Sequence, residues 1–368
     1  AHWLPFNLNI PAGPITDLAF HKRDDALVVA TEGRSFYVLD DLATVRQIHG
    51  VAPNDPVRLF APSPAIRALG GGGFGGTRGA APVGQNPASG VVLHYWLKEK
   101  PAGEVTLEFL DSAGKLVKRV SSKGEPVDGA PAADDDDDDG PRRPRGAAKA
   151  PAEQGMNRFV WNMRYPDATG FPGLIMWAGQ LAGPLATPGA YQVRLTANGQ
   201  TVTQRFEIRK DPRATATAAE FEAQLALLLQ LRDKVSQANS GVVRIRDARR
   251  QLEPYTHGDN KAVAQAAADL IKKLTAVEQE LYQTRNKASQ DPLNFPIRLN
   301  NKLAALMGTV AQSDRGPTEQ SQRVFEDLAT RTNAQLSIME RLMKNELSVF
   351  NRLVREQNVP AVVVKPGA

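Results

Sequence analysis

The pattern of apolar and polar positions changes character once along the chain. As far as about residue 210, apolar residues come in short runs or alternate with polar ones, which is typical of strands. Beyond Thr217 they recur every three or four positions, as on the buried face of a helix. The pattern therefore predicts a chain whose first part is β and whose last part is α.

The first 57 residues contain four short strand-like runs separated by polar turns. Glu32, Gly33 and Arg34 form the tight turn between the last two runs. Strands spaced this closely favour a four-stranded antiparallel meander, which is the size of one propeller blade. Such a small sheet is marginal alone, so we expect further strands or a helix to cover it. The runs are WLPFNLNI, ITDLAFH, ALVVAT and SFYVLD.

Residues 58–90 are dominated by Gly, Ala and Pro, and the stretch ALGGGGFGGTRGAAPVG is the extreme case. Such a segment has too few side chains to bury, so we expect a linker. Its GxG-like matches do not indicate a phosphate loop, because no strand precedes them and no helix follows.

Strand signals return over residues 91–210. One hairpin is predicted with Gly114 in its turn, and another at Asn198-Gly199, a pair typical of two-residue hairpin loops. Two hairpins with flanking strands indicate a small immunoglobulin-like β-sandwich. A charged insert, residues 124–155, interrupts it with six consecutive Asp. Calcium loops space their ligands and place a Gly at the sharp turn, so we expect a solvated, disordered loop.

Residues 216–358 are predicted to form long helices. Thr217 and Glu220 have the spacing of a capping box at the first helix start. The connections between the helical segments are short, which favours an antiparallel helical bundle within the chain. The heptad-like spacing is also compatible with a dimeric coiled coil, and the sequence leaves the oligomeric state open.

Composition narrows the class of protein further. The net charge is +5, but Lys and Arg are scattered rather than interleaved with aromatic residues in a stripe, so we expect no nucleic-acid partner. There is no cysteine, which excludes disulfides and thiolate chemistry. No apolar run is long enough for a membrane span. The chain begins at Ala1 with an amphipathic segment already in progress, and we expect a processed or truncated polypeptide.

The sequence contains no familiar catalytic pattern. The five histidines are dispersed and form no metal-ligand spacing, and no GxSxG nucleophile motif is present. Asp40 and Asp41 are adjacent, so on a strand they point to opposite faces and cannot both address one glycosidic bond. We therefore expect no catalytic residue, no metal and no cofactor in this chain.

Three aromatic residues are candidates for contact with a carbohydrate or a partner: Trp177, Tyr165 and Phe171. Trp177 lies in the loop GFPGLIMWAGQLAGP, where it either stacks on a sugar ring or packs on a neighbouring domain. Trp161 alternates with Phe159 and is expected in a core. The polar connector around Asn294, Arg298, Asn300 and Asn301 is a weaker candidate, because Asn and Pro also end and start helices.

Several segments in fixed order resemble a known group of proteins. They include DLAFHKRDDALVVATEGRSFYVLDDL, VRLFAPSPAIR, HYWLKEKPAGEVTLEFLDSAGKLVK, GMNRFVWNMRYP, GPLATPGAYQVRLTANGQTVTQRFEIRKDPR and ELYQTRNKASQDPLNFPIRLNNKLAAL. Over nearly the whole chain this resembles the C-terminal region of bacterial exported, sortilin-like propeller proteins with BNR (Asp-box) repeats, which are commonly labelled glycosyl hydrolase or sialidase-like.

The resemblance implies a secreted or periplasmic protein in which residues 1–57 are the last blade of an otherwise absent propeller. Its partner would be the upstream propeller polypeptide, with a glycan or protein as a further ligand. The Asp-box itself is absent here, and a propeller's ligand site lies across its central channel, on blades that this chain does not contain. We therefore expect a non-catalytic role in architecture and interaction. The alternatives are an accessory region of a glycoside hydrolase and a peptide-binding, sortilin-like protein.

Overall fold

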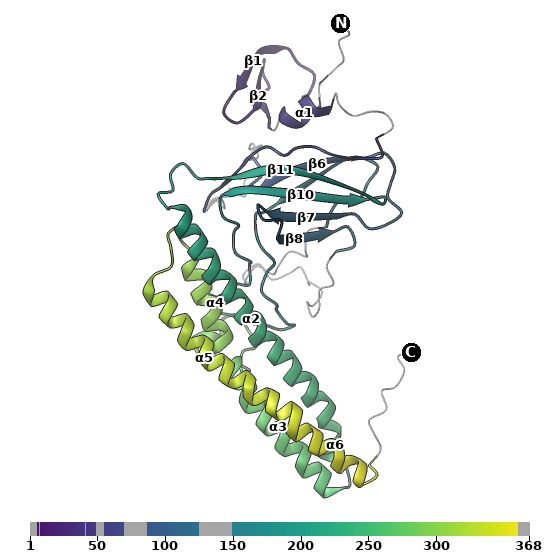
Figure 1. Ribbon diagram of the computed structural model, residues 1–368, viewed down its shortest axis with the longest axis vertical. Coiled ribbons are helices and arrows are strands. Elements are labelled where there is room, and N and C mark those ends of the chain that lie inside the picture. The colour runs from purple at the N-terminus through teal and green to yellow at the C-terminus, as the bar shows by residue number, and fades with distance from the viewer. Residues whose placement is uncertain are drawn as a thin grey trace. The chain divides into compact units, whose positions relative to one another are not determined.

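The computed structural model describes residue 6 and residues 8–40, 42–48, 55–69, 87–124 and 149–359. The chain divides into two compact units that alternate along the sequence. Unit 1 holds the strands and unit 2 the long helices (Figure 1). The protein is thus a mixed α and β chain with several sheets. Unit 1 comprises Ala1–Glu125, Ala147–Met163 and Pro188–Asp211, and unit 2 comprises Pro126–Gly146, Arg164–Thr187 and Pro212–Ala368.

A small antiparallel sheet, which we call the N-terminal sheet, begins unit 1. Its strands are β1 (Ile15–His21), β2 (Ala26–Thr31) and β3 (Phe36–Leu39), in that order. The turn expected at Gly33 is confirmed: this residue has a φ of +76°, which glycine adopts without steric cost. Helix α1 (Leu42–Ile48) follows. Of the first expected strand, residues 3–10, only residue 6 and residues 8–10 are described, and they form a turn and irregular chain rather than a strand. Within the described residues the expected four-stranded meander therefore has three strands.

Two further sheets form the rest of unit 1. One has three strands in the order β4-β6-β9, and the other has five in the order β5-β11-β10-β7-β8. Both predicted hairpins are confirmed, with positive φ at Gly114, Asn198 and Gly199. The strands are β4 (Val57–Leu59), β5 (Ala65–Arg67), β6 (Val91–Leu97), β7 (Thr106–Asp111), β8 (Leu116–Ser121), β9 (Gly155–Trp161), β10 (Gly189–Ala197) and β11 (Gln200–Lys210).

Aromatic side chains of these two sheets pack against one another. Trp161 on β9 is 1% exposed, and its ring stacks on Phe109 of β7 with centroids 4.3 Å apart. It also meets Tyr191 and Phe206 edge-on, at 6.1 and 6.2 Å. Trp161 is therefore a core residue, as its position on a strand predicted.

The segment expected to be a linker is in part a pair of strands. Residues 57–59 and 65–67 form β4 and β5, which join different sheets. Each has only three residues and lies next to prolines, so neither shows a period-two pattern long enough to recognise. The Gly-rich residues 70–86 and most of the acidic insert, residues 125–148, lie outside the described part of the chain.

Unit 2 contains the predicted long helices. The capping box is confirmed: the Thr217 N–H donates to Glu220 Oε2 at 2.8 Å, and the Glu220 N–H donates to Thr217 Oγ1 at 3.3 Å. The last two helices are continuous through a π-helical turn, Leu342–Glu346. The helices are α2 (Ala218–Leu252), α3 (Lys261–Leu281), α4 (Leu299–Val310), α5 (Glu319–Arg341) and α6 (Leu347–Glu356).

Side-chain pairs fix the directions of the helices. Arg244 of α2 pairs with Glu340 of α5, and Lys234 with Asn333, so α2 and α5 run in the same direction. Lys273 of α3 pairs with Glu346, beyond α5, whereas the earlier residue Asn260 pairs with Gln357; α3 therefore runs the opposite way.

Helix α4 runs antiparallel to α2, because Asn300 binds Asn239 and Val310 accepts from the earlier Gln224. Helices α3 and α4 thus form one antiparallel member of a bundle, interrupted at residues 282–298. The helices share one buried apolar core.

Candidate functional site

A non-helical segment of unit 2 packs on the helices through several polar contacts. Residues 164–187 were expected to be part of the β-sandwich predicted over residues 91–210. In the structure they belong to unit 2 and pack against α2, α3 and α4. We call this segment the strap. It contacts Tyr282 and Asn301, on the two sides of the interruption between α3 and α4, and also Ser236 and Asn239 of α2.

Asn301, in the first turn of α4, holds the strap at Trp177. The Trp177 N–H donates to Asn301 Oδ1 at 2.8 Å, and Asn301 Nδ2 donates to the Trp177 carbonyl at 2.7 Å. Asn301 is 4% exposed, whereas Trp177 is 42% exposed. The backbone of Trp177 is therefore fixed while its indole stays partly open to solvent.

A second pair of asparagines holds the strap at Thr169, which precedes Trp177 in the chain. Asn300 Nδ2 donates to Asn239 Oδ1 at 2.9 Å, and Asn239 Nδ2 donates to the Thr169 carbonyl at 2.7 Å. Both asparagines are fully buried. The Thr169 N–H donates in turn to Ser236 Oγ at 3.0 Å. Buried amides need such partners, because an unsatisfied polar group in a core is costly.

Tyr282, the residue that ends α3, anchors the middle of the strap. Its hydroxyl donates to the Gly173 carbonyl at 3.2 Å and accepts from the Ile175 N–H at 3.3 Å. Its ring meets Phe171 edge-on with centroids 5.1 Å apart. Burial raises the pKa of the Tyr282 hydroxyl, so this group stays protonated and keeps donating.

A buried ion-pair cluster lies beside these rings. Glu278 is 2% exposed and accepts from Arg246 Nε at 2.7 Å and from Arg249 Nη1 at 2.6 Å. The Arg246 guanidinium also lies over the Phe171 ring, 4.8 Å from its centroid. A shallow hollow of about 330 Å³ is lined here by Arg246, Arg249, Arg250 and Glu253.

These contacts hold the strap on the helices. We call the set of residues that makes them the clamp: Asn239, Glu278, Tyr282, Asn300 and Asn301. Each carboxylate oxygen of Glu278 accepts a hydrogen bond from a guanidinium group. The amides of Asn300, Asn301 and Asn239 bind each other and the strap backbone. Within the described residues, no group of three or more His, Cys, Asp or Glu residues is arranged so that it could bind a metal ion.

All three aromatic candidates from the sequence lie on the strap. Phe171 is 6% exposed and belongs to the helical core, which favours packing over contact with a ligand. Tyr165 is partly buried, and its N–H donates to the Pro184 carbonyl at 2.9 Å. Trp177 remains the most accessible of the three.

The connector candidates divide into two groups. Asn300 and Asn301 bind the chain itself, as described above. Arg298 pairs with Glu280 at 3.3 Å, and Asn294 is exposed. Two residues missed by the sequence reading, Glu278 and Tyr282, are central to the clamp. An acid at a buried helical position was the available signal for Glu278, because such residues are almost never buried unless paired.

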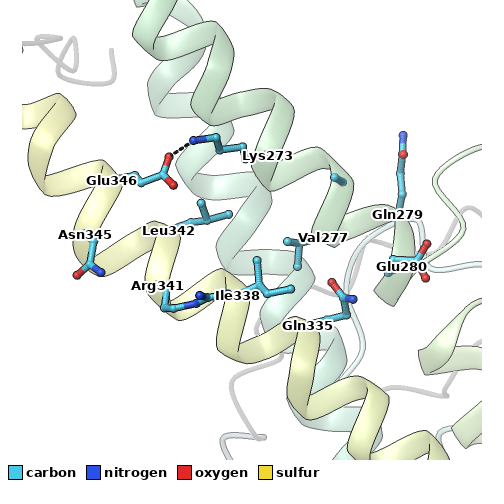
Figure 2. Close-up of a pocket in the computed structure, with 11 residues that line it drawn as sticks. Lys273, Val277, Gln279, Glu280, Gln335, Ile338, Arg341, Leu342, Asn345 and Glu346 are labelled. Carbon is cyan, nitrogen blue, oxygen red and sulfur yellow. Dashed lines mark hydrogen bonds and ion pairs between the residues drawn. The ribbon is translucent and has the colours of Figure 1, made fainter.

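A second feature of unit 2 is a groove between α3 and α5, which we call the α3/α5 groove. Its volume is about 670 Å³. Figure 2 shows Val277, Ile338 and Leu342 between the two helices, with the Lys273–Glu346 ion pair, 2.7 Å long, bridging them. The groove is lined by Lys273, Ala276, Val277, Gln279, Glu280, Gln335, Ile338, Arg341, Leu342, Asn345 and Glu346.

The histidines and the Asp40–Asp41 pair belong to other parts of the chain. In unit 1, His94 Nδ1 is 3.1 Å from Thr44 Oγ1, and His21 is 3.1 Å from Asp24. Asp40 is exposed at the end of β3, while Asp41, His2 and His49 lie outside the described residues. His257 lies in the short helical turn that follows α2.

Comparisons with known proteins identify no family for this chain. No family model matches the chain, and no curated protein matches it. One solved structure, described as pT26-6p, is similar at 10% identity with a TM-score of 0.13, covering 68% of this chain. The chain spans 46% of that protein's length. A TM-score of this size supports no conclusion about fold or activity.

Among the helices that the structure describes, none is both long and apolar enough to cross a membrane.

Proposed function

We propose that this chain is the non-catalytic C-terminal part of a secreted or periplasmic propeller protein, acting in domain architecture and in interaction with a protein or glycan. The N-terminal sheet is then the last propeller blade, the two facing sheets are an immunoglobulin-like sandwich, and the helices form a binding module. The observation that carries the proposal is the exposure of apolar side chains on both faces of the N-terminal sheet.

The register assigns these side chains to faces. Leu18 and Phe20, 56% and 66% exposed, pair across the sheet with β2 residues Val29 and Leu27. Because directly paired residues share a face, Leu18 and Phe20 lie together on one side.

The other face carries a second exposed pair. Phe36 and Val38, 72% and 56% exposed, pair with Ala30 and Val28, which alternate with the residues of the first face. Exposed apolar side chains therefore lie on both faces of the sheet, and the second face also carries Asp17 and His21 on β1.

A sheet with exposed apolar side chains on both faces is suited to burial between two layers. A propeller blade meets this condition, because it is a small sheet packed between neighbouring blades. Because each of the four side chains is only partly exposed, covering it would contribute on the order of 1–2 kcal/mol. Within the described strands, β1 and β3 each pair only with β2, which leaves both edges available to further strands.

The first test is the intact mass of the native polypeptide, captured with an antibody against the helices. We expect several hundred residues more than the 368 of this chain, with repeated Asp-boxes. A native mass of 39.9 kDa would overturn the proposal.

A substitution separates a blade from an ordinary surface sheet. Phe36→Asp should leave the free energy of unfolding of the isolated chain almost unchanged, because Phe36 is exposed there. In the native polypeptide, where neighbouring blades would bury it, the same change should cost roughly 3 kcal/mol or more. Leu116→Asp, at an exposed position of β8, is the matched control and should be near neutral in both.

The exposed indole of Trp177 supports the second candidate, an accessory region of a glycoside hydrolase. A tryptophan whose backbone is fixed and whose ring is open can stack on a sugar. On this alternative, Trp177→Ala abolishes the retardation of the chain in polysaccharide gels, and the intact protein hydrolyses aryl glycosides. Unretarded wild-type chain and no turnover by the intact protein would eliminate it.

A further inference from the structure

The two outer edges of the N-terminal sheet differ in how their backbone groups are treated. Within the described strands, β1 and β3 each pair only with β2. An unpaired edge presents a row of free N–H and C=O groups, to which a further strand can bind. The residues on each edge show which of the two is suited to receive such a strand.

The hydrogen-bond pattern identifies the outward backbone groups of β3. Where the hairpin begins, the Thr31 N–H donates to the Ser35 carbonyl at 3.2 Å. In an antiparallel pair, bonded and non-bonded residue pairs alternate, and the register between β2 and β3 is unbroken. Tyr37 therefore bonds to β2, whereas the N–H and C=O groups of Phe36 and Val38 point outward.

The same alternation identifies the outward groups of β1. A middle strand uses alternate residues for its two neighbours, so Val28 of β2, which does not bond to β3, bonds to Ala19 of β1. Leu18 and Phe20, on either side of Ala19, therefore point their backbone groups away from the sheet.

The β1 edge carries features that discourage a further strand. The Leu18 N–H already donates to Asp17 Oδ1 at 2.8 Å. The pairing register shifts between Ile15 and Asp17, as it does at a β-bulge. Charged side chains and bulges are means by which proteins keep an exposed edge from pairing with another chain. The β1 edge is therefore suited to remain open.

The β3 edge has none of these features. Its residues, Phe36–Leu39, carry no charge, and their pairing with β2 is regular. Within the described residues, no side chain bonds to the outward backbone groups of Phe36 or Val38. The side chains of these two residues are 72% and 56% exposed. An apolar edge without protection is one that a native protein covers.

We propose that a strand of the upstream propeller polypeptide pairs with β3 and completes the blade, while β1 remains the open edge. This inference rests on the proposed function, because the strand belongs to that polypeptide. A blade has four strands, one more than the N-terminal sheet has among the described residues. The meander expected from the sequence put the fourth strand, residues 3–10, before β1, whereas the chemistry of the two edges favours a place beyond β3.

This position defines the chemistry of the added strand. Its backbone would bond to the free groups of Phe36 and Val38, and its side chains would lie beside theirs on one face and beside those of Tyr37 and Leu39 on the other. Because neighbouring blades would cover both faces, the strand should be apolar at successive positions. We expect a short run of mainly β-branched or aromatic residues without proline.

Hydrogen exchange tests each edge one amide at a time, in the isolated chain and in the native polypeptide. The Phe36 and Val38 amides should exchange freely in the isolated chain and roughly 100-fold or more slowly in the native polypeptide. The Phe20 amide, on the β1 edge, is the matched control and should exchange freely in both. Protection should survive an about tenfold dilution, because a strand of the same polypeptide does not dissociate.

A pair of substitutions tests the outward N–H of β3 directly. Val38→Pro removes this donor without removing a bond to β2, a change that edge strands tolerate. Val38→Ala is the matched control, because it also removes the branched side chain but keeps the N–H. In the native polypeptide, Val38→Pro should speed exchange at Phe36 about tenfold or more relative to Val38→Ala. In the isolated chain the two variants should exchange alike at Tyr37, which reports that β3 still pairs with β2.

Several results would overturn the inference. Protection of Val38 in the isolated chain would place the strand within these 368 residues, and protection lost on dilution would assign it to a second copy. Protection of Phe20 instead of Val38 would put the fourth strand on β1, and free exchange at both edges would leave the blade with three strands. These last two results would leave the proposed function standing. The proposed function itself fails on a different observation, a native mass of 39.9 kDa, which is measured before any exchange.

Discussion

Asn301 holds Trp177 by both of its backbone polar groups, accepting from the N–H at 2.8 Å and donating to the carbonyl at 2.7 Å. This is the pairing that a neighbouring strand would supply, provided here by one side chain at the start of a helix. An amide is the right group, because it is the side-chain type that carries both a donor and an acceptor at this separation.

Asn301→Ala should therefore destabilise the protein by about 1–3 kcal/mol, since it leaves two polar backbone groups of the strap without partners. The measurement is urea unfolding followed by tryptophan fluorescence, in which the signal of Trp177 should also shift. Asn294→Ala is the control: Asn294 is exposed in the connector, and its replacement should change stability very little. Equal stability of the two variants would show that the clamp is not important for the fold.

Glu278→Gln should be more costly than an ordinary surface change. It removes the carboxylate shared by Arg246 and Arg249 while leaving both guanidinium groups partly buried. Loss of one partner of a buried pair costs about 3–5 kcal/mol, and we expect the lower end because the arginines are about one-third exposed. Glu280→Gln, at a half-exposed pair, should cost less than about 1 kcal/mol. Thermal unfolding of both variants at one pH compares them directly.

Gly183→Ala should disrupt the strap. A Cβ at this position would lie 2.1 Å from the Tyr165 carbonyl oxygen and 2.5 Å from that of Pro166. Backbone atoms have little freedom to move away, so we expect a loss of about 3 kcal/mol or more. Gly103→Ala, where a Cβ meets no atom within 4 Å, is the control and should be close to neutral. Chemical denaturation reports both, and an unaffected Gly183→Ala chain would contradict the observed close approach.

Stability should fall in alkaline solution because of Tyr95. Burial raises the pKa of its hydroxyl, which donates to the Pro151 carbonyl. The folded state therefore holds this proton more tightly than the unfolded state, whose tyrosine titrates near pH 10. The stabilisation is complete below about pH 10 and is lost progressively as the pH rises above it, toward the folded pKa.

The measurement is the free energy of unfolding at several pH values between about 9 and 11, taken only under conditions in which unfolding is reversible. Tyr95→Phe should lower stability at neutral pH by about 1 kcal/mol through the lost hydrogen bond, and should flatten this alkaline decline. An absorbance titration should show Tyr95 still protonated when exposed tyrosines have ionised. A decline of equal slope in the variant would assign it to other groups.

Local signals in the sequence were sufficient for most of the regular structure. Gly33, Gly114 and Asn198-Gly199 mark turns because their backbones adopt left-handed φ values, which few other residues tolerate. Thr217 and Glu220 mark a helix start because they satisfy each other's backbone groups. These are interactions between near neighbours, so short patterns predict them.

The clamp and the α3/α5 groove depend on contacts between distant residues, which no short pattern encodes. Trp177 and Asn301 are 124 residues apart in the chain, and the strap has no periodicity that assigns it to the helices. The π-helical turn at Leu342–Glu346 likewise interrupts a helix whose sequence reads as continuous. The sequence identified Trp177, Phe171 and Asn301 as residues of interest, but not that they belong together.

The interleaving of the two units along the chain bears on the order in which they can be completed during synthesis. The strap leaves the ribosome before β10 and β11, yet its partner Asn301 follows more than a hundred residues later. The strands of unit 1 can pair as soon as β10 and β11 have been synthesised, whereas the strap can pack only after α3 and α4 have been made. A fragment beginning at Pro212 would lack the strap altogether, so the helices are best studied with residues 164–187 retained in the same polypeptide.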